Sequence, residues 1–437
     1  MPRLPLSAWI LAVSLVATVA VAQSPPPRPL PPSITGAAPT PPAASVRPAT
    51  GEQVPAPVGR FLTDIHAYPA ETTQAVVALR SGAEWLWKMN QPGGRFVPGV
   101  NAAWQRYLDP DANDLRQAQA TLALAEAAAF TRDEKLAARA NGAVLALLAL
   151  TKVEGDCRVP VAPSAQCNRV GFAATVALAI YHLPAPDARQ LADAELLCAF
   201  LRKQCRPNGA VNHTDTMTDE PHKADPDGAT LYPGVALDAL LANQQVKPDA
   251  TTRDLLAKAV AHYRSLAKAQ PSAALAASLV PAFVEVTLLT NKDPGLTAAT
   301  LELADYLCAC QYTRSDTRVG HWVGGFRSAP AAANEPSAAS AGCVTALCAA
   351  AKLTRQIPDA ARFHKYRGHV LAGLQFVGGL QYTADNAEHF EKSFRTRFLV
   401  GGCRVGPSDG VARVDATAGL VCALGAYLRS GAEGKVE

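Results

Sequence analysis

The sequence predicts an all-α protein, an (α/α)6 toroid of about twelve helices in two concentric rings. Three observations lead to this fold. From about residue 60 onward the apolar residues follow a helical period, and no stretch is convincing as a strand. The helices alternate between apolar, Ala-rich segments and segments with one charged face. A Gly-rich turn followed by an Ala-rich helix also occurs twice.

The repeated unit is clearest at 323–353 and at 400–428. The first copy has VGGFRSAP at 323–330, and the second, which starts 77 residues later, has VGGCRVGP at 400–407. The two copies match at Val-Gly-Gly, Arg and Pro, and both continue into a small-residue helix with Ala-Leu and a cysteine. Agreement over so many positions indicates an internal repeat.

Several helix starts can be read from local chemistry. Thr131-x-x-Glu134 is a predicted capping box, and Thr251-x-x-Asp254 caps another helix. Pro186 lies at a first-turn position. The twelve predicted helices in chain order cover 73–88, 115–129, 131–150, 171–183, 186–204, 231–243, from 251 onward, 271–290, 296–311, 337–353, 358–380 and 413–428.

Alternation along the chain gives the architecture. The even-numbered helices are apolar on all sides, as in GFAATVALAIYHL from Gly171, whereas the odd ones carry a charged face. A helix that is apolar all round is buried, and an amphipathic helix lies outside. Strict alternation therefore predicts an inner and an outer ring in one domain, 61–437. An open α-solenoid is the alternative.

Two segments precede this domain. Arg3, an apolar stretch at 9–20 and a small-x-small site at 20–22 predict a signal peptide, 1–22, and an exported protein. An uncleaved anchor is the alternative. Residues 23–60 are rich in Pro, Ala, Ser and Thr and predict a disordered linker. No later segment has the length and apolarity of a membrane helix, so we expect no membrane span in the mature chain.

Composition excludes several functions. The net charge of +4 is spread evenly, and there is no Lys/Arg run, so nucleic acid is not an expected partner. No zinc-finger, P-loop or Rossmann pattern occurs, and no cofactor is expected. The expected ligand is a small molecule or a glycan in the central funnel, while the oligomeric state stays open.

All ten cysteines follow the predicted signal peptide. An even number of cysteines in an oxidising compartment favours disulfides, and Cys157 and Cys167, which flank a Pro-rich loop, are the best candidate pair. Cys198, Cys348 and Cys422 lie inside apolar helices and are expected to be small core residues. The absence of Cys-x-x-Cys argues against a metal site.

The turn-plus-helix unit resembles the repeat of the terpenoid cyclase and protein prenyltransferase superfamily. VGGFRSAP at 323–330 followed by GCVTAL at 342–347 is similar to the Gly-Gly-Phe turn and inner helix of prenyltransferase β subunits. QPGGRF at 91–96 resembles the Gln-x-x-x-Gly-x-aromatic motif of the cyclases, and YPGVAL at 232–237 resembles the Tyr-Pro-Gly-Glu-Ala-Leu helix start of bacterial α/α-toroid proteins. The resemblance covers about 70–430 and implies the toroid fold.

The catalytic motifs of that superfamily are missing. The chain lacks the Asp-x-Asp-Asp acid of the cyclases. Asp415 matches the zinc-binding Asp of the prenyltransferases, but Thr417 stands where their Cys would be. The resemblance therefore implies a fold and not a reaction.

The Gly-rich turns and the N-termini of the inner helices should converge on one mouth, which favours an anionic ligand. Six residues near this mouth are the predicted substrate-binding set: His321, Trp322, Arg327, Arg404, Arg413 and Asp415. The alternative is structural, with each arginine capping a helix or pairing with Glu335 or Asp415.

The loop at 208–232 is the richest polar segment. Its His213, Asp225, Asp227 and Tyr232 are the predicted catalytic residues, because acid–base work uses these side chains. Asp225-x-Asp227-Gly228 also suits a hard cation such as calcium, or a simple turn.

Three functional hypotheses follow. The first is an exported enzyme that acts on a polysaccharide or other anionic substrate in the funnel. The second is a non-catalytic toroid that binds a glycan, peptide or lipid at the cell surface, and the low aromatic content of 6% slightly favours it. The third is a diverged relative of the cyclases and prenyltransferases.

Overall fold

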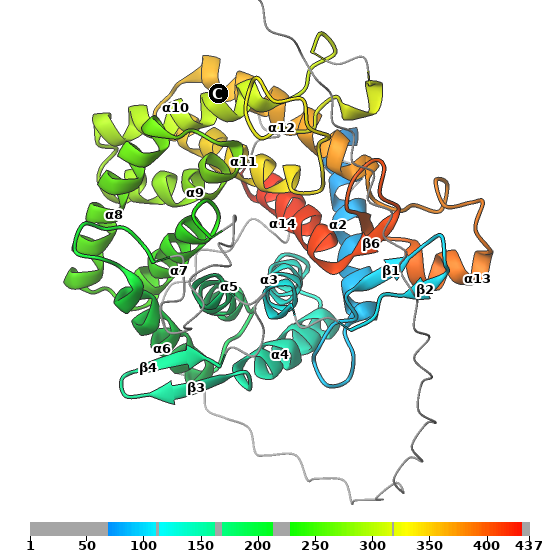
Figure 1. Cartoon of the computed structure of the whole chain (residues 1–437), viewed down its shortest axis with the longest axis horizontal. Helices are drawn as coiled ribbons and strands as arrows, with labels where there is room; N and C mark the ends of the chain where they lie inside the picture. Colours follow the sequence, from blue (N-terminus) through cyan, green and yellow to red (C-terminus); the bar gives the residue numbers. More distant parts are fainter. Residues whose placement is uncertain (1–68, 111–112, 162–167, 213–227, 317–318, 431–437) are drawn as a thin grey trace, which may run out of the picture. The chain divides into compact units, whose positions relative to one another are not determined.

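The computed structural model describes residues 69–110, 113–161, 168–212, 228–316 and 319–430. Twelve long helices of these residues alternate along the chain between two rings (Figure 1). The outer ring consists of α2 (Ala70–Met89), α4 (Glu134–Leu148), α6 (Ala188–Gln204), α8 (Ala250–Ala269), α10 (Pro294–Cys310) and α12 (Ala360–Gly379). The inner ring consists of α3 (Asp114–Thr131), α5 (Arg169–Tyr181), α7 (Tyr232–Val246), α9 (Ala273–Leu289), α11 (Ser340–Gln356) and α14 (Val414–Ser430).

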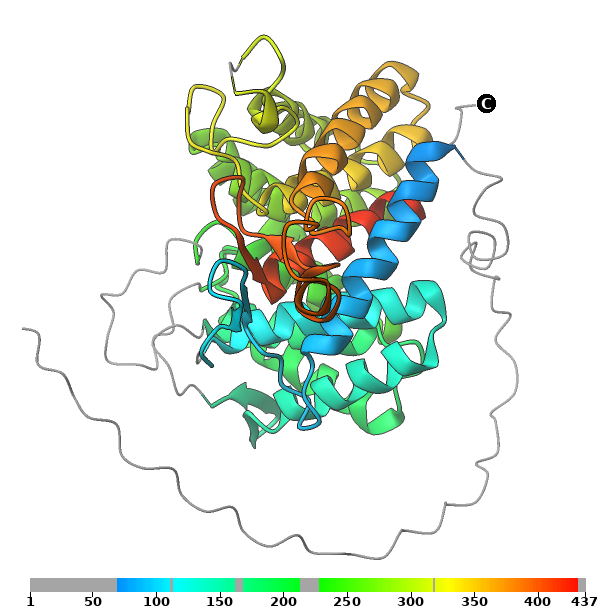
Figure 2. The ribbon, with the colours of Figure 1, turned by 90° about the vertical axis from the view of Figure 1, so that its right-hand side faces the viewer.

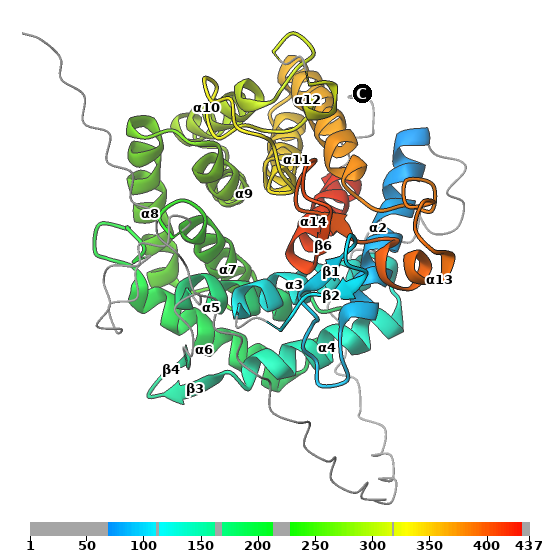
Figure 3. The same ribbon diagram turned by 45° about the vertical axis from the view of Figure 1, so that its right-hand side comes forward.

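The inner ring is closed. Each inner helix packs against the next inner helix in chain order, and the last one, α14, packs against the first one, α3 (Figure 3). Closure confirms the predicted (α/α)6 toroid and rules out the open solenoid. The inner helices are buried as their composition predicts, and in α5 every residue from Val170 to Ile180 is buried.

Four equivalent turns connect outer helices to inner helices. Gly94, Gly209, Gly324 and Gly401 stand at the same place in these turns, with φ angles of 82°, 87°, 89° and 99°. In each turn an isolated β-bridge joins one residue that precedes the glycine to one residue that follows it, for example Gln311 to Phe326. Left-handed backbone favours glycine, so the Gly-rich turn is a repeated structural device.

The same glycines hold neighbouring outer helices together. A Cβ on any of them would lie 2.5 Å or less from backbone of the next outer helix, at Gly142 (2.5 Å), Lys258 (2.3 Å), Ala372 (2.1 Å) and Ser81 (2.2 Å) in turn order. Three polar side chains bind the glycine carbonyls from the helix ends. Asn90, Gln311 and Gln381 donate to these oxygens at 2.8, 2.9 and 3.1 Å.

The expectation that the chain has no strands was wrong. The described residues include β1 (Gly99–Asn101), β2 (Arg106–Tyr107), β5 (Cys403–Arg404) and β6 (Val411–Arg413), which form one antiparallel sheet in the order β2-β1-β6-β5. A separate hairpin contains β3 (Thr151–Glu154) and β4 (Cys157–Pro160). Strands of two to four residues are too short to show an alternating pattern in the sequence.

Two predicted helix caps were also wrong. Asp133, not Thr131, caps α4, because its carboxylate accepts from the backbone N–H of Lys135 and of Leu136. Asp249, not Thr251, caps α8. Pro186 precedes the capping residue Asp187, so it lies outside α6. In each case the aspartate directly before the first helical residue takes the capping position.

Nine cysteines lie in the described residues, and all are free thiols. The proposed partner of Cys157 is Cys167, which lies outside the described residues. Cys198 and Cys348 are buried in the core as expected, whereas Cys422 is only half-buried on α14. The predicted signal peptide and linker also lie outside the described residues. Among the described helices, none is both long and apolar enough to cross a bilayer.

Candidate functional site

The long connections of the ring gather at one end. Loops from outer to inner helices, including 90–113, 311–339 and 380–413, stand at the end where the inner helices begin, which we call the mouth (Figure 2). The connections at the opposite end are short, such as 132–133 and 357–359. Long loops on a rigid scaffold commonly carry function, so the mouth is the candidate location of the functional site.

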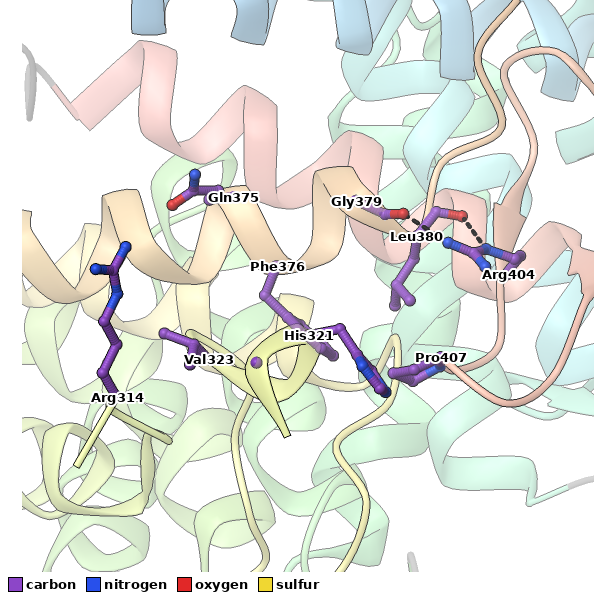
Figure 4. A pocket seen from close by; sticks show the side chains of 10 residues that line it. Arg314, His321, Val323, Gln375, Phe376, Gly379, Leu380, Arg404 and Pro407 are labelled. Carbon is purple, nitrogen blue, oxygen red and sulfur yellow. Dashed lines mark hydrogen bonds between the residues drawn. The ribbon is translucent and has the colours of Figure 1, made fainter. Parts of the chain in front are cut away.

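One pocket at the mouth contains two of the predicted substrate-binding residues. His321 and Arg404 line a cavity of about 740 Å³ between residues 314–316 and 320–323, the end of α12 and the 404–407 turn (Figure 4). Its ten lining residues are Arg314, Gly320, His321, Val323, Gln375, Phe376, Gly379, Leu380, Arg404 and Pro407. Three of these are basic and none is acidic, so the lining favours an anion.

Arg404 has a structural task as well. Its guanidinium donates to the carbonyl oxygens of Gly379 (2.7 Å) and Leu380 (3.4 Å) and lies 5.7 Å from the centre of the Tyr382 ring. These bonds satisfy the last carbonyls of α12. They also fix the position of the charge. Arg314 and His321 make no ion pair with the described residues and are exposed.

Arg327 and Trp322 meet at a different place. Both pack on Tyr312: the Arg327 guanidinium is 5.0 Å from the ring centre, and the Trp322 ring is 5.5 Å away. Arg327 also donates to the carbonyl of Ala309 (3.3 Å) at the end of α10 and lies 3.7 Å from Asp316. These contacts fit the structural alternative, and a role in substrate binding stays a prediction.

Arg413 and Asp415 form an ion pair at the start of α14. Both guanidinium Nε and Nη2 of Arg413 donate to the carboxylate, and Arg116 of α3 lies 3.5 Å from the same carboxylate. Burial opposes ionisation of Asp415, but the charge of Arg413 outweighs it and lowers the pKa of this carboxyl. The pair joins the last inner helix to the first.

Thr417, which stands where the prenyltransferases have a zinc-binding cysteine, has a structural role in this protein. It is fully buried, its hydroxyl accepts from the backbone N–H of Cys403 (2.9 Å) and it donates to the carbonyl of Arg413 (2.8 Å). The side chain therefore fixes the turn that precedes α14. In the described residues no group of three or more His, Cys, Asp or Glu side chains is placed to hold a metal ion.

The predicted catalytic loop is mostly outside the described residues, which omit His213, Asp225 and Asp227. Tyr232, its fourth member, is buried at the first position of α7, and its ring lies against Gly171 of α5. A Cβ on Gly171 would be 2.5 Å from this ring. Tyr232 thus packs two inner helices together, and its catalytic role stays a prediction.

Charged residues that the sequence analysis missed face the axis of the ring. Outer helices and inner neighbours cover each inner helix on every side except the one toward the axis. Partly exposed positions on α7 recur at Val235, Asp238 and Ala242, which marks this side. On the same reasoning Glu285 of α9 and Lys352 of α11 face the axis.

Asp238, Glu285 and Lys352 come from three successive inner helices. Lys352 Nζ lies 2.8 Å from Glu285 Oε1. Asp238 has no hydrogen-bond or ion-pair partner among the described residues. Burial, and then the negative charge of Glu285, raise the pKa of Asp238 well above its ordinary value. A carboxyl of raised pKa beside a second carboxyl is an arrangement that acid–base catalysis uses. The sequence feature that could have revealed Asp238 is a single carboxylate in an otherwise apolar helix, GVALDALLA at 234–242.

A second charged group lies toward the other end of the inner ring. Glu126 of α3 receives a hydrogen bond from Arg429 of α14 (2.9 Å), and His182 Nδ1 lies 4.0 Å from it. Burial lowers the pKa of His182, which favours the neutral ring. Burial and the adjacent Glu126 raise the pKa of the Cys422 thiol. This group therefore joins helix ends and holds no thiolate nucleophile.

No protein-family model matches the chain, and no curated protein matches it in sequence. Solved structures do match it. An unsaturated glucuronyl hydrolase from Bacillus sp. GL1, responsible for the degradation of glycosaminoglycan, aligns with a TM-score of 0.58 and 15% identity over 81% of this chain and 96% of that chain. D-mannose isomerase aligns with a TM-score of 0.58 and 12% identity over 82% and 99%.

The GH76A α-1,6-mannanase of Salegentibacter sp. HEL1_6 aligns with a TM-score of 0.56 and 12% identity over 81% of this chain and 98% of that chain. At such identities these structures show the fold, and they agree with the closed double ring. They do not show membership of the terpenoid cyclase superfamily, although they confirm the toroid that the resemblance implied.

Proposed function

We propose that this protein is an exported toroid that binds a carboxylate-bearing glycan at its mouth. The pocket lined by Arg314, His321 and Arg404 carries the proposal, because its lining is basic without any acidic side chain. Arginine recognises carboxylates through paired hydrogen bonds. The neighbours that share the fold act on glucuronyl, mannan and mannose substrates, which supports a sugar as the ligand.

The experiment is a calorimetric titration of the protein with an oligogalacturonate and with a neutral oligosaccharide of equal length. We expect binding of the acidic ligand alone, weakened by salt because the attraction is ionic. A double variant, Arg314→Ala with His321→Ala, should lose about tenfold or more in affinity. Arg253→Ala, which removes an exposed arginine of α8, is the matched control. Equal loss in both variants, or equal binding of the neutral sugar, refutes the pocket.

A catalytic role is the second part of the proposal. Asp238 with its raised pKa is suited to donate a proton, and Glu285 is suited to accept one. Carboxylates carry activity in one of the neighbours, since an α-1,6-mannanase variant with two Asp→Asn changes is inactive. We therefore assign Asp238 and Glu285 the acid and base roles in processing the bound glycan.

A measurement of product formation distinguishes a catalytic role of Asp238 and Glu285 from binding alone. A panel of uronate-containing oligosaccharides is incubated with the protein, and product release is followed by chromatography. Asp238→Asn and Glu285→Gln should each lower the rate by about 100-fold or more and leave binding unchanged. Thr345→Ala, on the axis-facing side of α11, is the control. If the wild type binds these sugars and converts none of them, the non-catalytic toroid is the correct hypothesis.

A further inference from the structure

An exposed aromatic side chain stands at the mouth, outside the pocket described above. Trp104 lies in the turn that joins β1 to β2 and is 67% exposed, the largest value for any large apolar side chain among the described residues. Burying an indole is strongly favourable, so a ligand that covers this exposed ring would gain binding energy from it. None of the pocket-lining residues contacts it.

The turn holds this indole in place. Asn101 Oδ1 accepts a hydrogen bond from the backbone N–H of Trp104 (3.1 Å). Gln105 adopts a left-handed φ of 51°, which costs a non-glycine residue about 1 kcal/mol. The hairpin is anchored below by β1, which pairs with β6 directly before α14. Trp104 is therefore presented on a rigid part of the ring.

Arg106 places a positive charge next to the Trp104 indole. Its guanidinium lies 4.7 Å from the centre of the Trp104 ring, and it has no ion-pair partner among the described residues. Arg106 pairs with Asn101, which pairs with Val411, two residues before Arg413. Since side chains of a strand alternate between faces, Arg106 and Arg413 share a face of the sheet.

The hairpin is fixed from the opposite face. The Tyr107 ring meets the Phe398 ring edge-on at 5.2 Å, and Val100 and Ala412 beside it are fully buried. The aromatic contacts continue from Phe398 to Phe394 at 5.4 Å. One face of the sheet is thus packed against aromatic side chains, whereas the Trp104 and Arg106 side chains remain in solvent.

We propose that Trp104 and Arg106 form a subsite for a carboxylate-bearing sugar residue. The exposed indole takes the apolar C–H face of a pyranose ring, and the Arg106 guanidinium, 4.7 Å from the ring centre, binds the carboxylate of that sugar. A neutral sugar would use only half of this site, and an acidic peptide would leave the indole face unused. The assignment rests on the proposed function, because it names the same class of ligand.

The subsite and the pocket lie at opposite edges of one sheet. Arg106 is on β2 and Arg404 on β5, so three strand spacings, about 14 Å, separate the two strands. Arg404 pairs with Ala412 and therefore lies on the face of the sheet opposite to Arg106, so an oligosaccharide that reaches both side chains must pass around an edge of the sheet. The subsite would then strengthen the binding of longer chains more than that of short ones.

Titration of five proteins with a short and a long oligogalacturonate tests this inference. The proteins are the wild type, Trp104→Ala, Arg106→Gln, Arg314→Ala and the control Leu145→Ala, which removes another exposed apolar side chain. We expect the first two variants to lose about tenfold in affinity for the long ligand and the control to lose nothing. Melting temperatures should stay equal, because all four side chains are exposed.

Each outcome decides one proposal or both. If Arg314→Ala weakens binding and Trp104→Ala does not, the subsite is wrong and the pocket stands. The reverse result keeps the subsite and refutes the pocket. A wild type that binds neither oligogalacturonate refutes both. If poly-glutamate binds as tightly, with the same dependence on Trp104 and Arg106, the ligand is an acidic peptide and the sugar assignment is wrong.

Discussion

Gly401 lies directly against the carbonyl oxygen of Ser81, so closely that a Cβ on the glycine would be 2.2 Å from that oxygen. Gly401 precedes the last inner helix, and Ser81 belongs to α2, the first outer helix. The contact therefore joins the two ends of the ring. Gly324 approaches Ala372 in the same way, since a Cβ on this glycine would be 2.1 Å from the Ala372 carbonyl oxygen, and this contact joins α10 to α12.

Replacement of Gly401 by alanine should destabilise the domain by about 2–4 kcal/mol, since it adds both a left-handed alanine and a backbone clash. Urea unfolding followed by circular dichroism measures the change. Gly93→Ala is the control, because nothing lies within 4 Å of a Cβ at that position. Equal stability of the two variants would show that the turn can move away from α2.

Asp415→Asn should lower the free energy of unfolding at pH 7 by about 1–3 kcal/mol, through loss of charge-assisted hydrogen bonds from Arg413. The pKa of Asp415 is lowered in the fold, so its contribution is present above the unfolded pKa and is lost as the pH falls through the folded pKa. Unfolding curves at pH 7 and pH 3 should therefore differ for the wild type more than for the variant. A constant difference at both pH values would rule out an electrostatic cause.

The cap of α4 can be tested by a pair of substitutions. Asp133→Ala should cost about 1 kcal/mol, because it leaves the N–H groups of Lys135 and Leu136 without an acceptor from the protein. Thr131→Ala should cost less, since its hydroxyl donates to the carbonyl of Ala127 inside α3 and accepts only one long hydrogen bond, from the backbone N–H of Asp133 (3.4 Å). Thermal melts compare the two. A larger loss for Thr131→Ala would restore the capping box that the sequence suggested.

Asp238→Asn should raise stability at neutral pH. Burial raises the pKa of Asp238, so in the wild type this group loses stability as the pH rises above the unfolded pKa of the carboxyl. Asparagine does not titrate, and the advantage of the variant should grow between pH 4 and pH 8. Urea unfolding across this range measures it. A variant that is more stable and inactive would mark Asp238 as a functional residue rather than a structural one.

The ring could be predicted from sequence because its signal extends over whole helices. Alternation between apolar and amphipathic segments depends on many residues in each helix, and single exceptions do not change it. The strands and caps depend on two to four residues each, which gives no redundancy. At Thr131 and Asp133 two capping side chains stand two positions apart, and only the structure distinguishes them.

The candidate site was less predictable for a different reason. Arg404 was predicted from its place in the repeated turn and His321 from its place just before Trp322, and both line one pocket. Arg314 and Gln375 stand in no repeated turn, so no pattern linked them to it. The axis-facing carboxylates stand in no polar loop and in no motif, so no pattern marked them, although a single carboxylate in an apolar helix is itself unusual.

The closed ring also constrains the order of folding. Trp85 Nε1 donates to the carbonyl of Phe398 at 2.8 Å, across 313 residues of chain. Contacts between such distant segments form slowly, because a long loop must close before they are gained. A growing chain can stack its first eleven long helices, yet α3 and α11 keep an uncovered apolar side until α14 has been synthesised and fills the gap between them. The last helix, α14, therefore closes the ring. Until it has been synthesised, a nascent chain would expose the apolar sides of α3 and α11 to chaperones.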